Sequence, residues 1–319
     1  MSHKTLIISS ITGVALILAG CASTGSSDTG PSASKRMAKG KKGMRMAGGP
    51  PSRSHTEITR GDIVLLPANK ALSIDNLMQE SVSGTTRTII SNGIPEHDVG
   101  AFPNRNNPNT IKARNYEFKM TTVPGQAGRI TLSDRWYWGV AMNGVPFEAQ
   151  TAEFWQGERG GWNYDALGGA LPLGLDANNA HVQPTGAYHY HGLPIGLMQA
   201  LNWKANKHSP QIGWAADGYP VYALTGDLGD GVKMLVSSYQ LKAGERPGGS
   251  NNPAGKYDGT FNQDWEYVAN SGDLDECNGT VTFSTEFPNG TYAYFLTKDH
   301  PFLSRCWTGT PNRSFFSNH

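Results

Sequence analysis

Cysteine is scarce in this sequence, with three residues among 319, at positions 21, 277 and 306. No CxxC pair occurs, and neither Cys277 nor Cys306 has a histidine beside it. Metal sites built from paired thiolates therefore lose support.

The common catalytic motifs are absent as well. The sequence contains no HExxH, no GxSxG, no Walker glycine loop and no GxGxxG after a strand, so the standard zincin, serine-hydrolase, nucleotide and dinucleotide classes lose support. The stretch DLDECNG (273–279) resembles the start of a calcium loop. The match fails because Asn278 stands where glycine is needed and Ser284 where glutamate is needed.

Basic charge is lacking in the part of the chain expected to fold. From His55 onward there are 19 Lys and Arg against 25 Asp and Glu, a net charge of −6, although the whole chain carries +1. An acidic domain without a basic stripe argues against nucleic acid as a partner.

The N-terminus has the pattern of a bacterial export signal. Lys4 is followed by the apolar stretch 6–18, which is too short to span a bilayer, and then by Leu-Ala-Gly-Cys ending at Cys21. This ending resembles the lipobox, which predicts a signal peptide over 1–20 and a Cys21 thiol carrying acyl chains such as palmitate. An ordinary signal peptide with an incidental cysteine is the alternative. No aspartate follows Cys21, which favours an outer-membrane anchor facing the periplasm or the cell surface.

Residues 21–56 are predicted to be a disordered tether. The segment is rich in Ser, Gly and Pro, has no apolar periodicity and carries seven basic residues. The positive charge is explained either by contact with anionic lipid headgroups or by a solvated linker. The lipid at Cys21 makes the membrane the expected partner.

Export to an oxidising compartment bears on the two remaining cysteines. Two leftover thiols there are most simply a disulfide, which predicts a Cys277–Cys306 bond. Closing that loop would contribute ~3 kcal/mol in the chain-entropy model.

Residues 57–319 are expected to form one mainly β domain, an antiparallel sandwich or distorted barrel with a few short helices. The composition favours this, with 39 Gly, 19 Pro and 31 aromatic residues. Predicted helices cover Asp75–Glu80 and Leu197–Ala205. Predicted strands cover Arg87–Ser91, Asn115–Thr121, Arg129–Leu132, Trp136–Met142, Val232–Ser237, Thr280–Ser284 and Thr291–Leu296. Most of the eight tryptophans should lie in the core, with Trp136 and Trp138 on one strand face.

The stretch HVQPTGAYHYHGLP (181–194) places three of the nine histidines within eleven residues. Pro184-Thr185-Gly186 suits a three-residue hairpin loop, which would put His181 opposite His189. Because side chains alternate along a strand, His189 and His191 then share a face. All three imidazoles would converge, whereas a loop one residue longer or shorter would separate them.

Three converging imidazoles suit a divalent transition metal such as zinc or copper, since Ca(II) and Mg(II) prefer oxygen. Three protein ligands plus an open position would also allow a metal-bound hydroxide to hydrolyse an unassigned substrate. Two alternatives remain open: structural histidines within an aromatic-rich sheet, and acid–base chemistry without metal.

The sequence resembles a known family, the YHYH-domain proteins, which are named for the tetrapeptide Tyr-His-Tyr-His found here at 188–191. The resemblance covers nearly all of the folded part and places both Cys277 and Cys306 inside family-like motifs, which supports the disulfide. It implies little about activity, because the family has no established general reaction. The motifs are SNGIPEHDVG (91–100), MNGVPFEAQTAEFW (142–155), LDANNAHVQPTGAYHYHGLP (175–194), IGWAADGYPVYAL (212–224), GDLDECNGT (272–280) and GTYAYFLTKDHPFLSRCWTG (290–309).

Other polar residues are candidates to join the site. Asp217 could be a general base, a fourth ligand, a partner that orients an imidazole, or simply part of an Asp-Gly turn. His97 and Asp98 lie in a predicted loop and are further candidate ligands. Asp176, Asn178 and Asn179 stand close enough to His181 to bond its second ring nitrogen, although Asx turns explain them equally well.

Two classes of function follow from these observations. The first is a metal-binding envelope lipoprotein, either a metal-dependent hydrolase or a storage or delivery protein. The second is a non-enzymatic envelope module that recognises a glycan or a protein through aromatic side chains, with structural histidines.

Overall fold

The computed structural model describes residues 55–134 and 136–316. The predicted signal peptide, Cys21 and nearly all of the predicted tether lie outside these residues. Nowhere in the described part of the chain does a helix combine the length and the apolar character needed to cross a bilayer.

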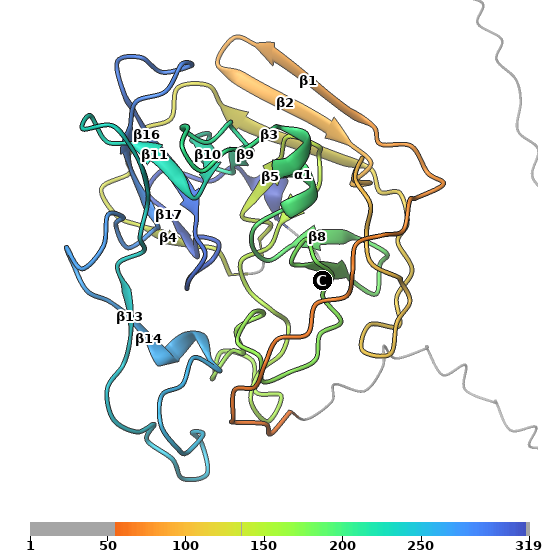
Figure 1. The fold of residues 1–319 in the computed structure, drawn as a ribbon, viewed down its shortest axis with the longest axis vertical. Helices are drawn as coiled ribbons and strands as arrows, with labels where there is room; N and C mark the ends of the chain where they lie inside the picture. The colour runs from red at the N-terminus through yellow and green to blue at the C-terminus, as the bar shows by residue number, and fades with distance from the viewer. Residues whose placement is uncertain (1–54, 135, 317–319) are drawn as a thin grey trace, which may run out of the picture. The chain divides into compact units, whose positions relative to one another are not determined.

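The largest sheet has eight strands in the order β15-β16-β10-β9-β5-β6-β8-β7 (Figure 1). Five of its seven pairings are antiparallel, whereas β10–β16 and β6–β8 are parallel. In chain order the strands are β5 (Gly139–Ala141), β6 (Pro146–Phe147), β7 (Ala180–Val182), β8 (Tyr188–Tyr190), β9 (Gly213–Ala215), β10 (Pro220–Ala223), β15 (Gly279–Thr282) and β16 (Thr291–Leu296).

A second, antiparallel sheet has the order β1-β2-β3. Its strands are β1 (Met78–Ser83), β2 (Thr86–Ser91) and β3 (Tyr116–Thr121). Three strand pairs complete the β structure: β4 (Thr131–Leu132) with β17 (Cys306–Trp307), β11 (Thr225–Asp227) with β12 (Val232–Met234), and β13 (Tyr239–Leu241) with β14 (Trp265–Tyr267). The helices are α1 (Ile195–Ala200) and the 3-10 turns η1 (Asn262–Asp264) and η2 (Arg313–Phe315).

The mainly β class predicted from the sequence is confirmed, and the sheets do not close into a barrel. The predicted helix over Asp75–Glu80 is wrong. Residues from Met78 onward form β1 instead, because each of them pairs with β2 across a turn at Gly84. The other predicted helix is present but ends early, since Asn202 adopts a positive φ of 57° that a helix cannot continue.

One main hydrophobic core contains side chains from both large sheets, among them Phe118 of β3 and Val140 of β5. All eight tryptophans are buried or half-buried, as expected for most of them. The prediction that Trp136 and Trp138 share a strand face is wrong, because β5 begins only at Gly139. Trp138 and Trp307 each donate an indole hydrogen bond to the backbone of the segment that holds the other.

The predicted disulfide between Cys277 and Cys306 is present. The two Cα atoms are 5.2 Å apart, and the two residues are 29 positions apart in sequence. The bond joins the turn before β15 to β17, and both cysteines are buried.

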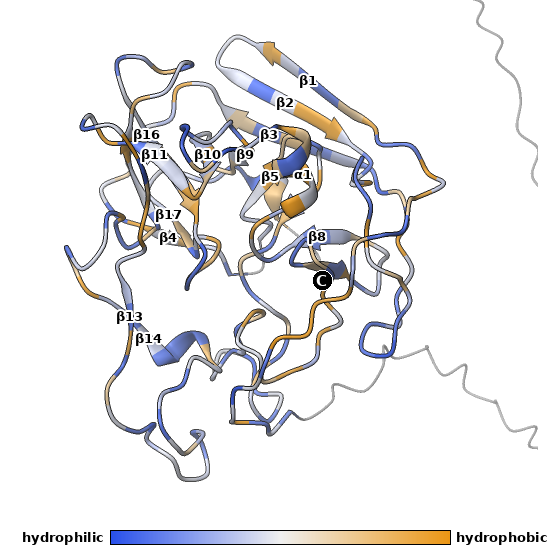
Figure 2. Cartoon of the chain, in the orientation of Figure 1, coloured by the Kyte–Doolittle hydropathy of each residue, from blue (hydrophilic) through white to orange (hydrophobic). Residues whose placement is uncertain are grey.

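The chain from 57 to 66 runs beside the segment that leads to the histidine hairpin. Gly61 bonds Gly169 through the backbone, and Leu66 forms a bridge with Asp176. Figure 2 shows residues 63–66 of this segment as a hydrophobic run, of which Val64 is 82% exposed.

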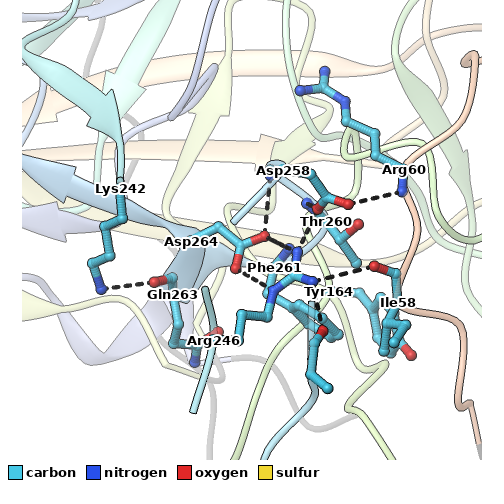
Figure 3. A network of polar contacts seen from close by, with 12 residues as sticks. Ile58, Arg60, Tyr164, Lys242, Arg246, Asp258, Thr260, Phe261, Gln263 and Asp264 are labelled. Carbon is cyan, nitrogen blue, oxygen red and sulfur yellow. Dashed lines mark hydrogen bonds and ion pairs between the residues drawn. The ribbon is translucent and has the colours of Figure 1, made fainter. Parts of the chain in front are cut away.

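A buried arginine ties the start of this segment to the domain (Figure 3). Arg246 uses both Nε and Nη2 to bond the carboxylate of Asp264, and Nη2 also reaches Asp258. Its Nη1 donates to the backbone carbonyls of Ile58 and Ala254. All five guanidinium N–H groups therefore have partners, which is the arrangement that a buried cation requires.

Candidate metal centre

The histidine hairpin has the register predicted from its loop. His181 pairs with His189, and Val182 pairs with Tyr188. The Gly186 amide donates to the carbonyl of Gln183 at 2.8 Å, and Gly186 has a φ of +90°. A Cβ atom at Gly186 would stand 2.7 Å from the Cβ of Lys112, so both the backbone conformation and the space require glycine there.

This register brings the three imidazoles together on one face of the sheet. The Nε2 atom of His191 lies 3.0 Å from that of His189 and 3.1 Å from that of His181. One ring nitrogen from each histidine falls within a group whose members all lie within 4.8 Å of one another. His189 and His191 are buried and His181 is half-buried.

Backbone carbonyls set the tautomer of two rings. The Nδ1 of His181 lies 3.0 Å from the carbonyl oxygen of Leu173, and the Nδ1 of His189 lies 3.1 Å from that of Ala187. A carbonyl oxygen can only accept, so both Nδ1 atoms carry the proton in the neutral rings. Their Nε2 atoms therefore present lone pairs toward the centre, as metal-ligating histidines do.

The third ring, His191, has its Nε2 between the other two. Its Nδ1 is buried without a partner in hydrogen-bond geometry, although the backbone of Glu148 lies close enough to influence the pKa of the ring. If His191 Nε2 carries a proton, it can donate to the other nitrogens in the metal-free protein. A cation at the centre instead satisfies all three lone pairs at once.

Burial keeps the rings of His181 and His191 neutral. It lowers the pKa of His181, and the hydrogen bond to Leu173 only partly opposes this. Burial, followed by the nearby His181, lowers the pKa of His191 well below its ordinary value. Neutral imidazoles are the form that binds metal, because protonation removes the lone pair.

Glu148 also lies at this site, and reasoning from the sequence missed it. Its carboxylate Oε2 is 3.4 Å from His189 Nε2 and accepts a 2.6 Å hydrogen bond from Gln183. Burial raises the pKa of Glu148 to about 8. A sequence signal existed, because the residue is a lone acid directly after the apolar strand at Pro146–Phe147.

The structure does not bring Asp217 to the histidines. Asp217 follows β9, which lies three strands from β8 in the sheet, or ~14 Å at the usual strand spacing. Its carboxylate accepts hydrogen bonds from the Tyr294 hydroxyl and the Gly309 amide, and burial raises its pKa to about 6. Asp217 therefore does not lie at the histidine site, and the prediction that it acts there as a base or ligand is wrong.

His97 and Asp98 do not join the centre either. The Nε2 of His97 lies 2.6 Å from the Tyr190 hydroxyl, and its Nδ1 donates to the carbonyl of Asp98. Tyr190 points to the opposite face from His189 and His191, because neighbouring residues of β8 alternate. Asp98 has an exposed side chain.

The acidic and amide residues before His181 bond the backbone and the opposite face of the hairpin. We call this the tyrosine face, because Tyr188 and Tyr190 lie on it. Asp176 accepts from the Asn178 amide, the predicted Asx turn, and also from the Tyr188 hydroxyl at 2.7 Å. The backbone carbonyl of Asn179 accepts a hydrogen bond from the backbone amide of His191. The second ring nitrogen of His181 bonds the carbonyl of Leu173 instead of any of these side chains.

Together the fold and the site define a mainly β domain in which a tight hairpin gathers three histidines at one edge of a mixed sheet. A family model described as YHYH protein matches residues 117–309, more than half of the chain. The protein belongs to this YHYH family. No curated protein and no solved structure matches the sequence.

Proposed function

We propose that the protein is a cell-envelope lipoprotein whose YHYH domain binds one divalent transition metal ion, zinc or copper, through His181, His189 and His191. The observation that carries the proposal is the convergence of the three Nε2 atoms, with separations of 3.0 and 3.1 Å. Nitrogen donors at ~2.1 Å from a shared ion lie ~3.0–3.4 Å apart, from a right-angled to a tetrahedral arrangement, so only a small movement of the rings is needed.

The donor chemistry fits this class of metal. Two rings have Nδ1 bound to a carbonyl, which orients Nε2 for coordination. Neutral nitrogen donors suit zinc and copper better than calcium or magnesium. An imidazole with lowered pKa also keeps its lone pair at the mildly acidic pH where an ordinary histidine is protonated.

The alternative function, an envelope module that recognises glycan or protein through aromatic side chains, has less support. It would need exposed aromatic platforms, but all eight tryptophans are buried or half-buried, and the exposed aromatic side chains, Tyr267, Phe283 and Phe316, belong to three separate segments. A metal-dependent hydrolase would need a coordination position open to substrate.

The membrane anchor is a separate part of the proposal, because Cys21 lies outside the described residues. The lipobox-like sequence supports acylation at Cys21 and an outer-membrane location. Radiolabelled palmitate should label the wild-type chain in cells, and Cys21→Ser should remove both the label and membrane association. A Cys21→Ser protein that stays labelled would contradict the anchor.

Elemental analysis of the protein, expressed without a histidine tag and dialysed, tests the metal site. We expect about one zinc or copper ion per chain. His189→Ala and His191→Ala should each abolish this binding, because two imidazoles hold an ion far more weakly than three. His208→Ala is the matched control, since His208 bonds Ser209 and Thr282 rather than the cluster. Wild-type protein without metal would overturn the proposal.

A further inference from the structure

We propose that Glu148 supplies the fourth donor to the ion held by the three histidines, so that the centre is coordinatively complete and leaves no position for a substrate. The inference rests on the proposed function, because it concerns the same ion. It assigns the site to metal binding rather than to metal-dependent hydrolysis.

The parallel pairing of β6 with β8 delivers Glu148 to the site. Phe147 pairs with Tyr190, and the backbone amide of Glu148 donates to the Tyr190 carbonyl at 2.9 Å. Phe147 contacts the ring of Tyr190, with ring centroids 5.7 Å apart. Because neighbouring side chains alternate, Glu148 points to the other face, where His189 and His191 lie.

The distance between the carboxylate and the nearest imidazole suits shared coordination. Oε2 of Glu148 is 3.4 Å from Nε2 of His189. Two donors on a tetrahedral ion with bonds of ~2.1 Å are separated by ~3.4 Å. The carboxylate stands at the edge of the three-nitrogen group rather than within it. Rotation about the Glu148 side-chain torsions, drawn by the cation, would complete the tetrahedron.

Charge supports a carboxylate in this position. Three neutral imidazoles would leave a buried divalent ion with its full charge of +2, which is costly away from water. A carboxylate ligand lowers the net charge of the centre to +1. The hydrogen bond from Gln183, at 2.6 Å, holds the carboxylate beside the hairpin, as outer partners of metal ligands commonly do.

Burial of the centre favours a closed site. His189, His191 and Glu148 are each less than one-tenth exposed, and His181 is half-buried. Two of the surface cavities, of about 380 and 260 Å³, lie beside Leu193 and Lys298. Neither is lined by Glu148 or by a histidine of the centre.

Cobalt substitution with azide as a probe tests the proposal on the folded, full-length domain. Wild-type protein loaded with Co(II) should show the intense visible bands of four-coordinate cobalt, and added azide should leave them unchanged. Glu148→Gln should weaken Co(II) binding by more than the ~10–100-fold that loss of an outer partner costs. Its cobalt should bind water, and its spectrum should then shift with azide.

Glu153→Gln is the matched control, because Glu153 is a half-buried acid of the same loop whose backbone amide contacts Thr151. It should keep the wild-type spectrum and affinity. Wild-type cobalt protein that responds to azide would overturn the inference while leaving the metal site in place, even if Glu148→Gln fails to fold. A Glu148→Gln spectrum identical to wild type would overturn it as well. Wild-type protein that takes up no cobalt would overturn the proposed function itself.

Discussion

Asp165 and His300 form a buried polar pair in this domain. The Nδ1 of His300 donates to Asp165 Oδ2 at 2.8 Å, and Arg305 donates to the same oxygen at 3.0 Å. The His300 ring stacks on Trp265 with an interplanar angle of 4°. Burial lowers the pKa of His300 to about 4, which Asp165 only partly opposes.

This pair predicts loss of stability in acid. Between pH 6.5 and about 4 the unfolded chain binds a proton at His300 that the folded chain excludes, so stability falls as the pH drops through this range. The loss should amount to about 3 kcal/mol. Arg305 and His300 outweigh burial and lower the pKa of Asp165 to about 2, so a further loss is expected below pH 3.8.

Urea unfolding of the metal-free protein at a series of pH values checks this. His300→Gln can still donate to Asp165 but does not titrate, so its stability relative to wild type should improve by about 3 kcal/mol from pH 6.5 to 4. The difference between the two proteins removes the contribution of the other histidines. Parallel profiles over this range would contradict the assignment.

At Arg246 the shape of the side chain matters as well as its charge. Its planar guanidinium bonds Asp264 with two donors, and the ammonium of lysine cannot reproduce this. Arg246→Leu should lower the free energy of unfolding by ~3–5 kcal/mol, because it leaves the buried Asp264 unpaired. Arg246→Lys should recover only part of this loss.

Chemical denaturation measures both Arg246 variants. Lys233→Ala is a suitable control, since it removes a solvent-exposed ion pair with Asp273 at 3.1 Å and should change stability little. The network also bonds the carbonyl of Ile58, so hydrogen exchange near Ile58 should increase in Arg246→Leu. Unchanged exchange would show that the segment is held by its other contacts.

At the scale of elements, the β7–β8 hairpin makes the site. Three residues in its loop set the register, and the register places His181 opposite His189. The parallel neighbour β6 then adds Glu148 from the other side. A one-residue shift in either pairing would turn these side chains to the tyrosine face.

Gly186→Ala tests the hairpin. The substitution forces a Cβ at a φ of +90° and 2.7 Å from Lys112, which should destabilise the domain by ~1–3 kcal/mol and weaken metal binding by displacing His181 from its partners. Thermal unfolding and metal titration provide the two measurements. Gly84→Ala is the control, with a φ of +58° in the β1–β2 turn and no atom within 4 Å of the new Cβ. It should cost some stability and leave metal affinity intact.

At the scale of the whole molecule, contacts between distant parts of the chain hold the domain together. The main core draws on β2, β3, β5, β8, β10 and β16. The disulfide adds a covalent link near the C-terminal end, where β17 pairs with β4. Trp138 and Trp307 exchange hydrogen bonds across the same region.

Removing the disulfide should therefore destabilise the domain without abolishing metal binding at the proposed centre. Cys277→Ser with Cys306→Ser should lower the free energy of unfolding by about 3 kcal/mol, since the unfolded chain regains the freedom of the open loop. Denaturation in the presence and absence of a reductant measures this in the wild type too. The double variant should not respond to the reductant, and a response there would point to another cause.

Much of this architecture could be predicted from local patterns. The alternation in Thr291–Leu296 predicted β16 with its observed bounds, and the Pro184–Gly186 loop predicted the register that gathers the histidines. Local pattern failed at Asp75–Glu80, where pairing with β2 outweighed the helical tendency. Asp217 and His97 were expected at the site because they are polar residues in conspicuous motifs, and their positions depend on sheet order and face.

What the sequence by itself determined is the β class, the disulfide partners and the three-histidine face, because each depends on residues close in sequence or on the only two cysteines of the expected domain. What only the tertiary structure decided is the neighbour of that face. Strand β6 pairs with β8 in parallel across a long connection, and Glu148 thereby comes 3.4 Å from His189. Non-local pairing is selected by the packing of the whole core, which no short stretch of sequence encodes.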